Sequence, residues 1–207
     1  MRWLLVLMMA AAPLAQAESD DEATRDLLER LAGLESLAAD FEQYTLTEGG
    51  DRLQESRGYM ELERPRKFRW HAREPFEQVV VSDGDVVWVH DVDLEQAVER
   101  RLSDEIANTP ALLFSGDTEK VSDTFLIREI SRTDQSVTWR LVPREDEQLF
   151  SLLEVTFEQG RPESMRMEDA LGQKTRVEFR DLSLNVAIDP ERFRFEPPEG
   201  TDVISEL

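Results

Sequence analysis

Side chains able to do covalent chemistry are few and scattered in this chain of 207 residues. Its two histidines, His71 and His90, fall on predicted strands, and their spacing is not that of zinc ligands. Cysteine is absent, and so are a glycine-rich phosphate loop and a G-x-S-x-G elbow. The 45 aspartates and glutamates form no pattern beyond chance pairs. Because no nucleophile–base pair is visible, we expect no catalytic residue, metal site, cofactor or enzymatic activity.

One arginine lies among apolar residues. Met60, Leu62 and Arg64 share one face of a predicted strand, which Pro65 ends. A guanidinium buried without acceptors is costly, so Arg64 must find partners. Two interpretations remain open. Arg64 extends past its apolar neighbours to solvent at the strand end, or it donates to exposed helix carbonyls or to an amide or ester group inside a concavity.

A set of aromatic and methionine side chains accompanies this arginine. Core packing would explain all of them, but a single sheet with two small helices leaves a deep concavity, and methionine suits a pocket that accepts variable shapes. Core and cavity roles therefore both stay open. The set comprises Met60, Phe68, Trp70, Phe76, Trp88, Phe114, Met165 and Met167.

The N-terminal region predicts an amphipathic helix followed by a strand. Ser19 and Glu22 fit a capping box, and an apolar stripe of about 20 residues follows. This stripe consists of Leu27, Leu28, Leu31, Leu34, Ala38 and Phe41. Near Phe41 the period shifts toward two, which predicts the first strand over residues 41–47.

The rest of the chain alternates strands with turns. Alternating apolar and polar residues predict strands with one dry and one wet face, and Asp83–Gly84 marks a hairpin turn. Residues 108–116 predict a short apolar helix, with proline at its first turn and glycine at its end. The fold class is mainly β with α. We expect one strongly curved antiparallel sheet, an unclosed half barrel, with an N-terminal helix and a short helix over its concave face. Strands are predicted near 58–64, 67–71, 79–81, 86–92, 124–132, 136–143, 149–158, 162–169 and 173–181.

Residues 1–17 have the features of a cleaved signal peptide. Arg2 supplies the positive end, an apolar stretch follows, and Ala15–Gln16–Ala17 is a typical cleavage site. We therefore expect export to a Gram-negative periplasm and one mature domain over residues 18–207. The formal charge of −21 argues against nucleic acid and against tight binding to anionic lipid. The acidity serves either solubility or mobility between anionic membranes.

Short motifs in a fixed order over nearly the whole mature chain resemble the LolA family, the periplasmic outer-membrane lipoprotein carriers. The motifs are Arg64–Pro65, Phe68–Arg69–Trp70, Pro75, 81–84 (VSDG), Trp88, 93–96 (DLEQ), 108–110 (NTP), 171–173 (LGQ) and 193–200 (FRFEPPEG). Departures are the strong acidity and Val92, at a position where the family often has proline.

The resemblance implies an unclosed barrel whose lidded cavity receives the acyl chains of lipoproteins. It implies loading by an inner-membrane LolCDE-type ABC transporter and delivery to an outer-membrane LolB-type receptor. By position, Arg64 corresponds to the arginine that in the family bonds carbonyls of the lid helices and so acts as a latch. Phe68 corresponds to the family's aromatic residue for transporter contact. Further candidates for the cavity or partner contacts are Trp70, Met60, Leu62, Trp88, Leu112, Leu113 and Phe114. We expect a monomer, because a carrier must hide its apolar surface internally.

Besides a lipoprotein chaperone, three other functions are compatible with the sequence. The same fold could serve an envelope sensor that binds lipidated proteins to signal, although such proteins usually carry an additional domain. It could also carry other lipids. An enzyme acting on acyl chains would need a nucleophile–base pair, which the sequence does not show.

Overall fold

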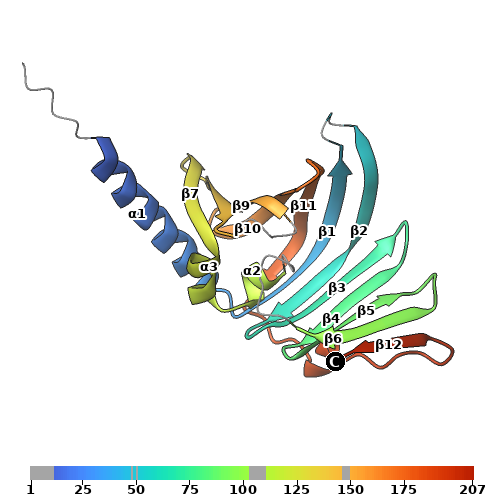
Figure 1. Cartoon of the computed structure of the whole chain (residues 1–207). Helices are drawn as coiled ribbons and strands as arrows, with labels where there is room; N and C mark the ends of the chain where they lie inside the picture. Colours follow the sequence, from blue (N-terminus) through green and yellow to red (C-terminus); the bar gives the residue numbers. More distant parts are fainter. Residues whose placement is uncertain (1–11, 48, 50, 103–110, 146–149) are drawn as a thin grey trace, which may run out of the picture.

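Twelve described strands form one curved, unclosed sheet, and three short helical segments and one long helix accompany it (Figure 1). The structure, a computed structural model, describes residues 12–47, 49, 51–102, 111–145 and 150–207. The mainly-β fold class and the unclosed sheet are confirmed. The helical segments are α1 (Ala12–Ala32), α2 (Leu112–Ser115), α3 (Thr118–Thr124) and the 3-10 helix η2 (Pro190–Phe193).

The strand order across the sheet is β12-β6-β5-β4-β3-β2-β1-β11-β10-β9-β8-β7. Every neighbouring pair is antiparallel except β12–β6, which is parallel and so departs from the expected all-antiparallel sheet. The strands are β1 (Ser36–Leu46), β2 (Arg52–Glu63), β3 (Lys67–Glu74), β4 (Gln78–Asp83), β5 (Val86–Asp91), β6 (Gln96–Arg101), β7 (Phe125–Arg132), β8 (Ser136–Pro143), β9 (Phe150–Glu158), β10 (Arg161–Asp169), β11 (Lys174–Leu184) and β12 (Asp202–Glu206).

The five later predicted strands match β7 to β11 to within three residues at each end. This agreement follows from their alternation, since inward residues such as Leu153, Val155 and Phe157 are fully or almost fully buried. The prediction did not find β6, β12, α3 or η2. The first two are short and charged, with no clear alternation, and β12 depends on a partner strand a hundred residues away.

The predicted N-terminal elements were wrong in their boundaries. Ser19 lies inside α1, which begins at Ala12, so it does not cap that helix. The helix ends at Ala32 and β1 begins at Ser36, five residues before Phe41. Ala38 and Phe41 matched the helical period by chance, whereas Leu37, Ala39 and Phe41 are buried on alternate residues of a strand.

The predicted short helix is present as α2, and Gly116 follows it as expected. The predicted start at Asn108–Pro110 lies outside the described residues. Gly116 has extended backbone (φ −76°) and its N–H donates to the carbonyl of Leu112 at 2.7 Å. A Cβ there would lie 2.4 Å from that carbonyl oxygen, so close approach, not a left-handed conformation, favours glycine.

The two faces of the sheet are covered differently. On the inner face, α1 and α2 pack onto inward residues of β1–β3 and β7–β11 in one apolar cluster. On the outer face, a smaller group containing Val79, Val81, Ala97 and Phe193 is buried beneath the chain that follows β11.

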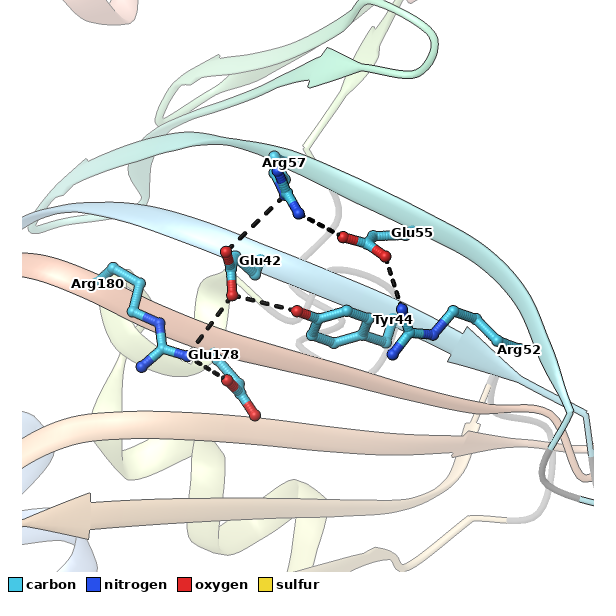
Figure 2. Close-up of polar contacts among 7 residues, drawn as sticks. All are labelled: Glu42, Tyr44, Arg52, Glu55, Arg57, Glu178 and Arg180. Atoms are coloured by element: carbon cyan, nitrogen blue, oxygen red, sulfur yellow. Dashed lines mark hydrogen bonds and ion pairs between the residues drawn. The ribbon is translucent and has the colours of Figure 1, made fainter.

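The outer face of β1, β2 and β11 carries a ladder of opposite charges (Figure 2). Arg57 lies between Glu55 (2.7 Å) and Glu42 (3.9 Å), and Arg180 lies between Glu178 (2.6 Å) and the same Glu42 (3.6 Å). These arginines are more than half exposed, so solvent screens each pair and it contributes little to stability. The ladder makes this a solvated face and leaves the inner face as the apolar one.

Candidate functional site: the Arg64 junction and the apolar interior

Arg64 joins the end of β2 to the ends of two helical segments. Its Nε donates to the carbonyl of Leu34 and its Nη2 to that of Leu31, both at 2.8 Å. Its Nη1 donates to the carbonyl of Gly116, directly after α2. All three acceptors are neutral backbone carbonyls near helix ends: Leu31 lies in the last turn of α1, Leu34 just after that helix and Gly116 just after α2. The Leu31 carbonyl also accepts from the N–H of Leu34 at 3.1 Å, so Arg64 adds a second donor to it.

The backbone around Arg64 strengthens this junction. The N–H of Arg64 donates to the Glu35 carbonyl (2.9 Å), and the N–H of Arg66 donates to the Ser115 carbonyl (2.7 Å). The Arg66 guanidinium also donates to the carbonyl of Leu102 at 2.8 Å. The turn after β2 thus holds the α1–β1 connection, the end of α2 and the end of β6 together.

Asn185, directly after β11, supports the same connection. Its side-chain amide donates to the Gly33 carbonyl (3.0 Å) and accepts from the N–H of Glu35 (2.9 Å). The residue has φ +55°, a left-handed conformation that asparagine tolerates better than most residues. The position of the α1 end is therefore fixed independently of Arg64.

The dipoles of backbone carbonyls stabilise the positive charge of Arg64. Burial lowers the pKa of its guanidinium, and the nearby carboxylate of Asp117 partly opposes that shift. An arginine remains protonated under these conditions. Carbonyl oxygens at a helix C-terminus carry partial negative charge, which suits a cation. Because no buried ion pair has to be broken, the junction can separate at a smaller cost than a buried salt bridge.

Six predicted site residues meet behind this junction. Met60 and Leu62 of β2 and Phe68 of β3 are at most 2% exposed and belong to the inner apolar cluster. The α2 residues Leu112, Leu113 and Phe114 are equally buried in the same cluster. α2 thus covers the apolar inner face of β2, and Arg64 lies beside the contact.

Trp70 lies at the margin of this interior. It is partly buried and stacks on Phe41 of β1, with ring centroids 3.9 Å apart. Gly58 lies opposite Phe41 in the β1–β2 ladder, and a Cβ at Gly58 would lie 1.9 Å from the His71 carbonyl oxygen. The glycine allows the close approach of β2 and β3 beside which the two rings stack.

Phe76, which is 65% exposed, is one exception among the aromatic residues considered for the core or the cavity, and Trp88 is another. In β5 it alternates with Val87, which belongs to the inner cluster, so Trp88 faces the other side of the sheet. There it packs against Phe195 at 5.4 Å, and His90 contacts the same ring at 5.2 Å. The structure therefore does not place Trp88 with the other candidates.

Several residues of the interior are ones that the sequence patterns miss or place elsewhere. Leu27 and Leu31 of α1 are fully buried in it, and Phe179 of β11 contacts Phe114 edge-on at 5.8 Å. Phe41 falls in the predicted helical stripe. The alternation of apolar residues around 37–41 is the signal that could have placed Phe41 on a strand facing inward.

Within the described residues, no three histidine or acidic side chains are grouped so that they could hold a metal ion. Over the same residues, no helix is both long and apolar enough to cross a membrane.

These features define a class of protein. An unclosed, mostly antiparallel sheet has an apolar inner face, and helices joined by an arginine cover that face. A solved structure of an uncharacterized conserved protein from Thermus thermophilus shares this fold, with a TM-score of 0.52, at 15% identity, 90% of this chain and 99% of that chain covered.

The family follows from sequence comparison. Residues 32–196 match the family model "Outer membrane lipoprotein carrier protein LolA". Outer-membrane lipoprotein carrier proteins of Alcanivorax borkumensis and Chromohalobacter salexigens are 46% and 42% identical, each with at least 97% of both chains covered. That of Pseudomonas aeruginosa is 40% identical over the full length of both chains. The chain belongs to the LolA family.

Proposed function

We propose that this protein is a periplasmic chaperone that takes lipoproteins released from the inner membrane, shields their acyl chains, and delivers them to an outer-membrane receptor. The observation that carries the proposal is the Arg64 junction, which closes α1 and α2 over the apolar interior by three carbonyl hydrogen bonds. The names of the relatives support the carrier role. The role is binding and transfer, without catalysis.

The energetics of an acyl anchor require both cover and release. Each methylene removed from water is worth about 0.8 kcal/mol, so a free triacyl group is very costly in water. A cavity that bound the chains too well would never give them up. A closed state stabilised by Arg64 lowers the net affinity, because loading must first break its hydrogen bonds. Transfer to a better acceptor is then downhill without an energy source.

The location and partners belong to the same proposal. Residues 1–17 direct export and are removed, leaving the carrier domain over 18–207. An inner-membrane LolCDE-type ABC transporter loads the carrier, and an outer-membrane LolB-type receptor unloads it. Within the interior, Phe68 and Trp70 contact the chains or the loading partner. The carrier works as a monomer.

The proposal is tested by a release and transfer assay. Spheroplasts depleted of their own carrier are incubated with the mature protein, and the supernatant is blotted for outer-membrane lipoproteins. We expect soluble one-to-one complexes. If the folded protein releases none, the carrier role is wrong, and native mass spectrometry of the purified protein would then show whether other lipids are bound.

The variant Arg64→Leu tests the latch role of Arg64 separately from the role of the apolar interior. This change removes all three helix contacts, so we expect loading to be kept or improved and transfer to the receptor to fall about tenfold or more, as the closed state no longer drives release. Arg176→Leu is the matched control, because Arg176 lies on the outer face, half exposed and paired with Glu178. Normal transfer by Arg64→Leu would refute the latch.

A further inference from the structure

Two hairpin tips present large apolar side chains to solvent side by side. Phe76, between β3 and β4, is 65% exposed, and Leu94, between β5 and β6, is 71% exposed. The tips touch, since the N–H of Val92 donates to the Glu77 carbonyl at 3.0 Å. We name residues 74–78 and 91–96 together the acidic knuckle.

The acidic knuckle lies far from the Arg64 junction. β3 runs away from the turn after Arg64 for eight residues, which places the β3–β4 tip about 25 Å from that turn. Figure 1 shows the β3–β4 and β5–β6 hairpins at the rim of the sheet away from α2. A partner held there would leave the helices that cover the interior free to move.

Hydrogen bonds hold the Leu94 tip in one conformation. The Asp91 carboxylate accepts from the N–H of Leu94 (3.1 Å), and the N–H of Glu95 donates to the Val92 carbonyl (3.2 Å). From β12, the N–H of Asp202 donates to the carbonyl of Glu95 at 2.7 Å. Leu94 is thus presented on a braced turn, and a preorganised anchor loses little conformational entropy when it binds.

Carboxylates predominate around the two anchors, although Arg73 directly precedes Glu74 and the Glu77 carboxylate contacts Nε2 of His71 at 2.7 Å. Residues 74–78 and 91–96 contain no lysine or arginine, and their five carboxylates belong to Glu74, Glu77, Asp91, Asp93 and Glu95. Exposed apolar tips alone would suit a lipid surface, but this carboxylate cluster is repelled by anionic lipid. The combination favours a protein face that offers apolar pockets within a basic surround.

We propose that the acidic knuckle is a docking site for a folded protein partner with a basic face, bound through Phe76 and Leu94 as apolar anchors. This inference rests on the proposed carrier function, in which such a partner gives or receives cargo. An interface made of two apolar anchors and the charged residues around them is small, and small interfaces are typical of transient complexes. A carrier that must leave each partner after transfer needs an interface of that kind.

The test measures binding directly. The probes are the purified periplasmic domain of the LolCDE-type transporter, the purified soluble form of the LolB-type receptor, and phosphatidylglycerol-containing vesicles. We expect wild type to bind a protein probe, more weakly at high salt, and not to bind the vesicles. Phe76→Ser with Leu94→Ser should raise Kd for that probe about tenfold or more. Asp93→Lys with Glu95→Lys should weaken binding and flatten its salt dependence.

Leu171→Ser is the matched control. Leu171 is 79% exposed on the β10–β11 hairpin, outside the acidic knuckle, and its replacement should leave Kd unchanged. The inference is overturned if wild type binds neither protein probe, if the double serine variant binds as wild type does, or if it loses vesicle binding instead. Lipoprotein release by wild type is measured in parallel, so a failed docking site and a failed carrier function give different results.

Discussion

At the scale of single residues, Arg64 shows how one side chain can join elements that the chain keeps apart. Its acceptors lie 30, 33 and 52 residues away along the sequence. Buried donors must be satisfied, and three backbone carbonyls at or just after helix ends satisfy this one. A lysine could not replace it, because one ammonium on a flexible stem does not match three acceptors arranged around a planar fork.

Gly58 occupies a position with no room for a larger side chain. A Cβ at position 58 would lie 1.9 Å from the carbonyl oxygen of His71, a backbone atom that cannot rotate away. We expect Gly58→Ala to lower the free energy of unfolding by about 3 kcal/mol, measured by urea denaturation. It should also weaken the Phe41–Trp70 stacking, visible as a change in tryptophan fluorescence.

Gly33→Ala serves as the control for that prediction. A Cβ at Gly33 would meet the carbonyls of Arg30 and Glu29 at 3.5 and 3.7 Å, which is ordinary contact. We expect it to change the unfolding free energy by about 0.5 kcal/mol or less. Equal destabilisation by the two variants would mean that the strand crossing at Gly58 is not tight.

At the scale of elements, α1 is attached to the sheet in two ways. Leu27 and Leu31 bury its apolar stripe, and ion pairs join its polar side to β7. Arg132 of β7 contacts Asp26 of α1 at 2.6 Å and Glu129 of its own strand at the same distance. Arg128 contacts Asp20 at 3.3 Å. α1 thereby lies along β7, the strand at that edge of the sheet, and protects it from edge-to-edge pairing.

The ion pair at Asp26 predicts a pH dependence. Burial alone would raise the pKa of the Asp26 carboxyl, but hydrogen bonds from Arg132 and Arg30 outweigh it and hold the pKa below its ordinary value of 3.8. A lowered folded-state pKa gives stability that is present above the unfolded pKa and lost as the pH falls through the folded one.

We therefore expect Asp26→Asn to be less stable than wild type by about 1 kcal/mol at neutral pH. The difference should persist at about pH 5 and be smaller at about pH 2, because the wild-type carboxyl takes up its proton as the pH falls through its lowered pKa. Urea unfolding at the three pH values measures it. A difference that stays constant down to the lowest pH would show that packing, and not the carboxylate charge, is responsible.

At the scale of the whole molecule, the excess of acidic residues dominates the electrostatics. Forty-five carboxylates face 24 lysines and arginines, so most cations can be paired while many carboxylates cannot. Self-repulsion of the surplus destabilises the folded state, and salt screens it. We expect the melting temperature to rise between about 20 mM and 500 mM NaCl, measured by circular dichroism. A fall over that range would mean that the ion pairs outweigh the surplus charge.

Local patterns in the chain are enough to predict much of the fold. Period-two alternation located β7 to β11, because each strand buries one face, and Asp83–Gly84 located a hairpin. The alternation also placed Arg64 in phase with Met60 and Leu62. Its need for acceptors predicted helix carbonyls as one of two outcomes, and the structure shows those contacts.

Features that depend on contacts distant in sequence required the three-dimensional structure. Alternation shows that Trp88 and Val87 face opposite sides, but it cannot tell which side is inner when both are covered. The parallel pairing of β12 with β6 and the meeting of α1, α2 and Arg64 likewise join segments far apart in the chain. Local patterns record whether a residue is buried. Which partner buries it is settled by the free energy of the whole fold.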